Sequence, residues 1–238
     1  MIGISIQLVI SWFIIWFIER KNLSVLGFRP TKSRIAGFAL FFIITALFCA
    51  SSFLMKMYFG GQQWKLNPTL TTSRVLDGVW WNIKSVLFEE LIFRGVLLYI
   101  LIRRTRPLTA IIISATAFGI YHWFSFGIFG NPIQMVIVLF ITGTMGLLLA
   151  YAYAKTFSLY IPIGIHLGWN FTQIFVFSQG PIGHGIFVQE NPSRFLTNSY
   201  LIFFCVTFMP LLLALLVNFL LIKKWKQAEA FVAKRPQI

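Results

Sequence analysis

Residues 79–102 read VWWNIKSVLFEELIFRGVLLYILI, and this stretch decides which class of protein the chain belongs to. It is long enough to form a membrane-spanning helix, which needs about 20 mostly apolar residues. Glu89, Glu90 and Arg94 nevertheless lie within it. Charged side chains at hydrocarbon depth are costly unless they pair or line a wet cavity, so they mark functional sites by default. The stretch therefore predicts a membrane protein with a functional site inside the membrane.

Composition extends this interpretation to the whole chain. Of its 238 residues, 58% are hydrophobic and only 11% are charged, more apolar surface than a soluble domain of this size can bury. Further apolar runs of helix-spanning length accompany the first. We expect a single integral-membrane domain over residues 1–238 with an all-α fold, a polytopic membrane helix bundle of about seven transmembrane helices. The predicted spans are 2–18, 35–55, 79–102, 108–126, 133–154, 158–178 and 199–222.

The basic residues predict an orientation for these spans. They cluster after the first, third and seventh runs, with Lys155 after the fifth, whereas the other connections hold only Lys56, Lys65, Arg74 and Arg194. Basic loops stay cytoplasmic, so the N-terminus is expected outside and the C-terminus inside, most simply in a bacterial plasma membrane. The net charge of +14 is explained by these loops, and we expect membrane lipid and no nucleic acid as a partner.

Two more predicted spans carry polar side chains, and their spacing indicates pairs. Glu90 and Arg94 are four residues apart, so they share a helical face, and the same spacing separates His166 from Asn170. Phe118 lies one turn before His122. If each run is one straight helix, Glu89, His122 and Asn170 lie about 20 Å from the basic ends of their helices and His166 about 13 Å. Similar depths on three helices favour one shared site, and the predicted catalytic core covers about residues 78–178.

Each pair also has a purely structural interpretation. Intramembrane Glu–Arg pairs and Asn side chains hold helices together, and a His near a helix end can be a hydrogen-bonded spacer. The sequence Gly143-Thr144-Met145-Gly146 indicates close helix packing, because glycine lets two helix backbones approach.

The three motifs EExxxR, FxxxH and HxxxN, in this order on separate predicted helices, resemble those of the CPBP family of intramembrane proteases. This family includes the CAAX prenyl endopeptidases of the Rce1 type and bacterial relatives linked to bacteriocin self-immunity. The resemblance implies hydrolysis of peptide bonds in membrane-associated peptides or proteins. It implies that Glu89 activates a water that His122 orients, that His166 and Asn170 stabilise the oxyanion, and that Glu90 assists, held by Arg94.

Two questions stay open at this point. Glu89, His122 and His166 could bind zinc with a water, but a metal-free mechanism driven by the glutamate uses the same residues, and the chain has no HExxH motif. The alternatives to a protease are a noncatalytic membrane partner such as a bacteriocin immunity protein, and a proton-coupled transporter. The transporter is disfavoured because no internal repeat is visible.

Overall fold

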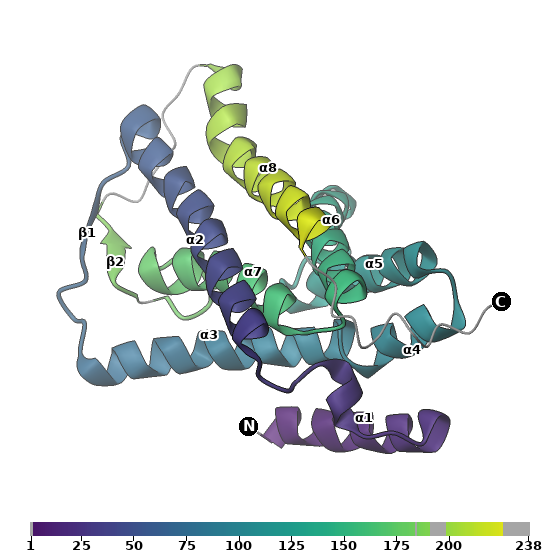
Figure 1. Ribbon diagram of the computed structural model, residues 1–238. Helices are drawn as coiled ribbons and strands as arrows, with labels where there is room; N and C mark the ends of the chain where they lie inside the picture. The colour runs from purple at the N-terminus through teal and green to yellow at the C-terminus, as the bar shows by residue number, and fades with distance from the viewer. Residues whose placement is uncertain (1, 184, 191–198, 226–238) are drawn as a thin grey trace. The chain divides into compact units, whose positions relative to one another are not determined.

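The computed structural model describes residues 2–183, 185–190 and 199–225 (Figure 1). Helices dominate, and the strands are short. In chain order the elements are α1 Ile2–Glu19, the 3-10 helix η1 Leu23–Leu26, α2 Lys32–Gly60, β1 Trp64–Leu66, α3 Thr72–Phe93, α4 Val96–Arg104, α5 Pro107–Ser125, α6 Pro132–Thr156, α7 Tyr160–Asn170, the π-helix η2 Phe171–Val176, β2 Phe187–Gln189 and α8 Tyr200–Lys224.

The predicted all-α membrane fold is confirmed. Among the described residues, five helices are long and apolar enough to cross a membrane, namely α1, α2, α5, α6 and α8. They correspond to five of the seven predicted spans. The sixth predicted span, 158–178, is helical but changes pitch, because α7 ends at Asn170 and η2 continues it with π-helical geometry. Such π segments occur mostly as single turns next to functional sites.

The third predicted span, 79–102, is wrong as one continuous helix. The helix breaks between α3 and α4 at Gly95, whose φ of −79° and ψ of −133° are not helical. A Cβ on Gly95 would lie 2.1 Å from the carbonyl oxygen of Leu91, so the backbone at this position requires glycine. Hydropathy continues unchanged across the break and does not reveal it. The depth estimated for Glu89 assumed a straight helix and therefore does not apply.

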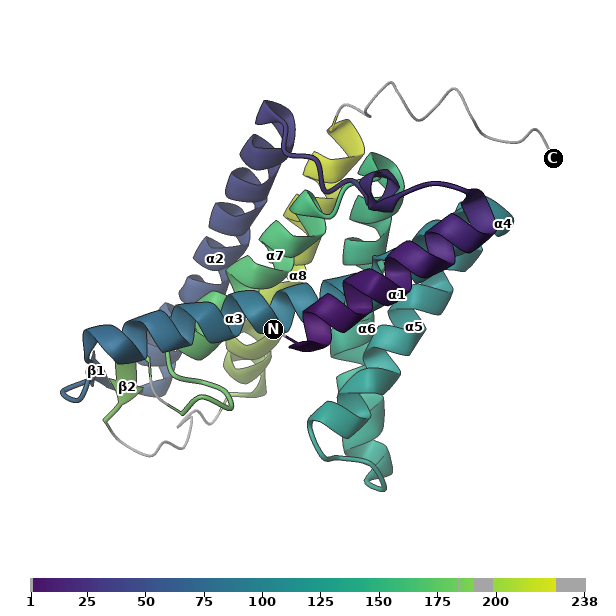
Figure 2. The same cartoon turned by 90° about the horizontal axis from the view of Figure 1, so that it is seen from below.

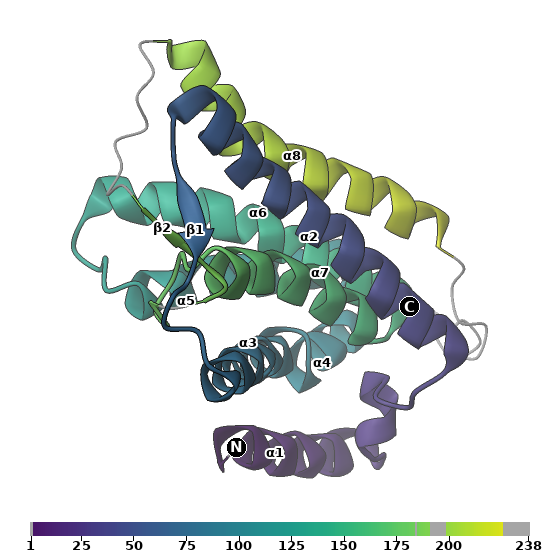
Figure 3. The ribbon, with the colours of Figure 1, turned by 90° about the vertical axis from the view of Figure 1, so that its left-hand side faces the viewer.

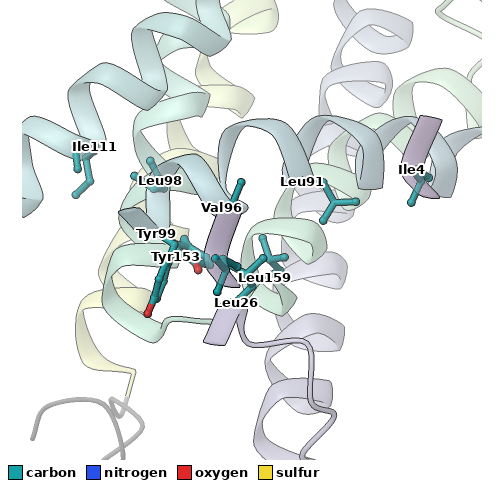
Figure 4. Packing of buried hydrophobic residues seen from close by; sticks show 12 residues of the cluster. Ile4, Leu26, Leu91, Val96, Leu98, Tyr99, Ile111, Tyr153 and Leu159 are labelled. Carbon is teal, nitrogen blue, oxygen red and sulfur yellow. The ribbon is translucent and has the colours of Figure 1, made fainter. Parts of the chain in front are cut away.

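The chain divides into two compact units, and several long helices contribute to both. The first unit comprises Met1–Gly37, Leu87–Ile163 and Phe219–Ile238. In this unit α5 packs along α6, and α4 contacts α1 (Figure 2). Its core gathers buried apolar side chains of α1, η1, α3, α4, α5 and α6, with fully buried Leu98, Tyr99 and Tyr153 (Figure 4).

The second unit comprises Phe38–Val86 and Gly164–Asn218. Here α7 packs closely on α2, because a Cβ on Gly164 would lie 2.6 Å from the carbonyl oxygen of Phe38, and one on Gly168 would lie 2.5 Å from that of Phe42. Strands β1 and β2 pair antiparallel as a small ribbon, with Lys65 opposite Val188 (Figure 3). The sequence did not predict this ribbon, since three-residue strands in polar connections carry no periodic signal.

Candidate functional site

The predicted Glu90–Arg94 pair forms, and it is fully buried. Arg94 Nη1 donates to Glu90 Oε1 at 3.1 Å, and both side chains have 0% exposure. Arg94 Nη2 reaches the carbonyl oxygen of Gly146 on α6 at 3.4 Å. The pair therefore joins the end of α3 to α6. Removing one partner of a buried ion pair leaves an uncompensated charge, so each side chain depends on the other.

Phe118, the first residue of the second motif, contacts both Arg94 of the first motif and His122. The Arg94 guanidinium lies 4.1 Å from the centroid of the Phe118 ring, as in a cation–π contact. The Phe118 ring also contacts His122, whose ring centroid is 4.5 Å away in an edge-on arrangement. The Phe118 ring thus contacts both Arg94 of the buried ion pair and His122. The supporting role of Phe118 and Arg94 stays a prediction.

Small residues make this arrangement possible. A Cβ on Gly146 would lie 3.1 Å from Ala115 Cα and 3.2 Å from Phe118 Cδ1, so glycine lets α6 approach α5 at this level without displacing either neighbour. The close packing predicted for the segment from Gly143 to Gly146 is confirmed. The Ser114 hydroxyl also donates to the carbonyl oxygen of Phe93 at 2.8 Å and fixes α5 to the end of α3.

His122 is held in one ring orientation and faces Glu89. Its Nδ1 lies 2.7 Å from the carbonyl oxygen of Phe118. Because a carbonyl can only accept, Nδ1 carries the hydrogen, and in the neutral ring Nε2 presents a lone pair. Nε2 lies 3.9 Å from Glu89 Oε2, and the two side chains are 9% and 13% exposed. A carboxylate and an imidazole lone pair are both acceptors, so this geometry suits a shared hydrogen donor between them.

The third motif forms a compact pair in the second unit. The amide Nδ2 of Asn170 lies 3.2 Å from Nε2 of His166, and His166 is 4% exposed. Residues 166 and 170 lie about 200° around the helix from Gly164 and Gly168, respectively. The glycine face of α7 is pressed on α2, so the backbone directs the two polar side chains to the opposite side of the helix.

The structure brings the predicted site residues together in two groups. Glu89, Glu90, Arg94, Phe118 and His122 form one group in the first unit. His166 and Asn170 form the other group in the second unit. No cluster of three or more His, Cys, Asp or Glu side chains with metal-site geometry occurs among the described residues. The predicted zinc ligands are therefore a hypothesis about donor types, not an observed cluster.

Sequence reasoning missed the backbone groups that support the site. The carbonyl oxygens of Phe118 and Gly146 orient His122 and Arg94, yet a carbonyl has no signature in a sequence.

These helices and the polar groups inside them define a polytopic integral-membrane protein. The sequence profile of the family described as type II CAAX prenyl endopeptidase Rce1-like matches residues 71–172. The matched segment contains all three motifs, so the resemblance that they predicted is confirmed. This family is a family of proteases, and the match supports a protease. Comparisons with curated proteins and with solved structures gave no match.

Proposed function

We propose that the chain is an intramembrane endopeptidase that hydrolyses peptide bonds of membrane-associated peptides or proteins with a water activated by Glu89. This proposal rests mainly on the position of Glu89 Oε2, which lies 3.9 Å from His122 Nε2. A water between two acceptors can donate a hydrogen to each, which leaves its oxygen lone pairs for the carbonyl carbon of a substrate. Glu89 takes a proton from this water as its oxygen attacks the carbonyl carbon, and returns that proton to the amide nitrogen, so that the C–N bond breaks and the amine leaves.

Asn170 would stabilise the negative oxygen of the tetrahedral intermediate, and His166 would hold the Asn170 amide in position by accepting one of its hydrogens. An amide nitrogen carries two hydrogens, and the Asn170 contact with His166 uses only one of them. The second can donate to the developing oxyanion, and preorganised donors away from bulk water stabilise such charge strongly.

Glu90 and Arg94 would act as positioning residues. Arg94 contacts both Glu90 and Phe118, and Phe118 contacts His122. Through this sequence of contacts the buried ion pair fixes the histidine that orients the water. Orientation of the reacting groups contributes to rate because a misplacement of about 1 Å can reduce it about a hundredfold.

A zinc form of the same site is testable. The carboxylate of Glu89 and the imidazole groups of His122 and His166 are donor types that zinc accepts, and zinc would supply an activated water. Elemental analysis of the purified protein distinguishes the two forms. Zinc bound at one ion per chain, and lost in His122→Ala, would establish the metal form, whereas cleavage by zinc-free protein would establish the metal-free form.

The function is tested in membranes, because the substrate is not known. Peptide termini are mapped by mass spectrometry in membranes from cells that produce the wild-type chain, Glu89→Gln or Asp77→Asn. The last variant makes the same chemical change at an exposed position of α3. We expect new termini with the wild type and Asp77→Asn and none with Glu89→Gln. Identical termini in all three would contradict the protease and favour a noncatalytic immunity or binding role.

A further inference from the structure

The ribbon of β1 and β2 has one edge with unused backbone groups. The hydrogen bonds from Asn67 N to Ile186 O and from Glu190 N to Gln63 O, both 2.9 Å, flank the paired residues. In an antiparallel ribbon, hydrogen-bonded pairs alternate with pairs that share no hydrogen bond, so Lys65 and Val188 form a hydrogen-bonded pair. Trp64 and Leu66 belong to the other kind of pair, and their N–H and C=O groups therefore point away from β2. Within the described residues these outward groups have no hydrogen-bond partner, and Leu66 is 66% exposed.

The opposite edge of the ribbon is partly covered. The hydroxyl of Ser178 donates to the outward carbonyl oxygen of Phe187 at 2.6 Å. The Phe177 ring also stacks on the Phe187 ring, with centroids 5.9 Å apart. An additional strand would therefore pair with β1 rather than with β2.

The ribbon is fixed to the element that carries the third motif. Ile186 N donates to the carbonyl oxygen of Phe175 in η2 at 2.8 Å. Trp64 and Phe187 pack in the same aromatic cluster as Trp169, the residue next to Asn170. The edge of β1 therefore keeps a defined position relative to His166 and Asn170, all within the second unit.

From this arrangement we propose that the outer edge of β1 binds the substrate polypeptide as an additional extended strand. The proposal rests on the proposed protease function and specifies the substrate class, which is an unfolded polypeptide segment recognised through its main-chain amides. Main-chain bonds to an edge strand supply affinity without demanding a particular sequence. The ribbon follows α2 and precedes α3, on the side predicted to be outside, so the substrate segment would approach from there.

The test removes one outward N–H and leaves the β1–β2 ladder intact. Leu66→Pro does this, since proline is tolerated at an edge position whose N–H faces outward. Leu66→Ala is the matched control that keeps the N–H, and Gln189→Pro removes the corresponding group from the opposite edge. The probe is fluorescently labelled β-casein, a disordered polypeptide. The Kd of casein for each variant is measured by fluorescence anisotropy in a Glu89→Gln background, where we expect no cleavage. KM and kcat are measured with the same variants in the chain that keeps Glu89.

We expect Leu66→Pro to raise Kd and KM by about threefold to tenfold, with kcat unchanged and both controls within about twofold of their parents. An unchanged Kd in Leu66→Pro, an equal rise in Gln189→Pro, or no binding of casein at all would overturn the proposal. The Kd requires no catalysis. Casein binding that depends on Leu66 would therefore leave the edge-strand site standing even if the peptide termini in membranes with and without Glu89→Gln were identical, a result that would refute the protease alone.

A second measurement applies if Leu66→Pro fails to fold. A short casein peptide and its form N-methylated at alternate residues are compared on the unaltered Glu89→Gln chain. N-methylation removes main-chain donors from the ligand, and we expect it to weaken binding by about threefold to tenfold. Equal affinity of the two peptides would overturn the proposal.

Discussion

Replacing Arg94 with methionine is expected to destabilise the protein by about 3–5 kcal/mol, because it leaves Glu90 charged and buried without its cation. Both side chains have 0% exposure, so water cannot compensate for the loss. Methionine retains much of the side-chain volume, which keeps the cavity contribution small. In a protein of this size the expected loss lowers the unfolding temperature by roughly 6–20 °C.

The assay is thermal unfolding in detergent of Arg94→Met, Glu90→Met and the double variant, analysed as a double-mutant cycle. We expect the double variant to be markedly more stable than the sum of the single effects, with a coupling energy of about 2–3 kcal/mol. Single variants that unfold within about 2 °C of the wild type, or additive effects in the double variant, would show that Glu90 and Arg94 do not stabilise each other.

Two further predictions test the supports of the site. Phe118→Leu removes the ring that contacts Arg94 and His122, and it is expected to lower the free energy of unfolding by about 0.5–2 kcal/mol. We also expect it to lower kcat with little change in KM. A lower kcat/KM with an unchanged kcat would contradict a positioning role. Gly168→Ala is expected to destabilise by about 1–3 kcal/mol, because its Cβ would lie 2.5 Å from the Phe42 carbonyl oxygen. Gly143→Ala, whose nearest neighbour would be 3.9 Å away, is the matched control and is expected to be neutral or slightly stabilising. Equal unfolding temperatures for these two alanine variants would show that the α7–α2 contact is not tight.

Local pairings could be predicted from the sequence because helical spacing determines them. Glu90 with Arg94, Phe118 with His122 and His166 with Asn170 are each four residues apart, and each pair is in contact in the structure. Five spans followed from hydropathy for a similar reason, since about 20 apolar residues suffice to cross the bilayer.

Features that depend on backbone conformation could not be predicted in this way. The break at Gly95 lies inside an apolar run, and only the steric limit imposed by the Leu91 carbonyl shows why glycine is present. The change of pitch after Asn170 and the pairing of Lys65 with Val188 likewise leave no hydropathy signal. The carbonyl groups of Phe118 and Gly146 orient His122 and Arg94 through contacts that only three-dimensional packing creates.

The initial rate of β-casein cleavage by purified, folded Glu89→Gln, compared with that of Asp77→Asn, tests whether the Glu89 carboxylate activates the water. Both variants replace one carboxylate of α3 by an amide, but only Glu89 faces His122. We expect Asp77→Asn to cleave at the wild-type rate and Glu89→Gln to lose at least about a hundredfold, the usual contribution of a general base. Cleavage by Glu89→Gln at the wild-type rate would contradict the assignment of this carboxylate as the group that activates the water.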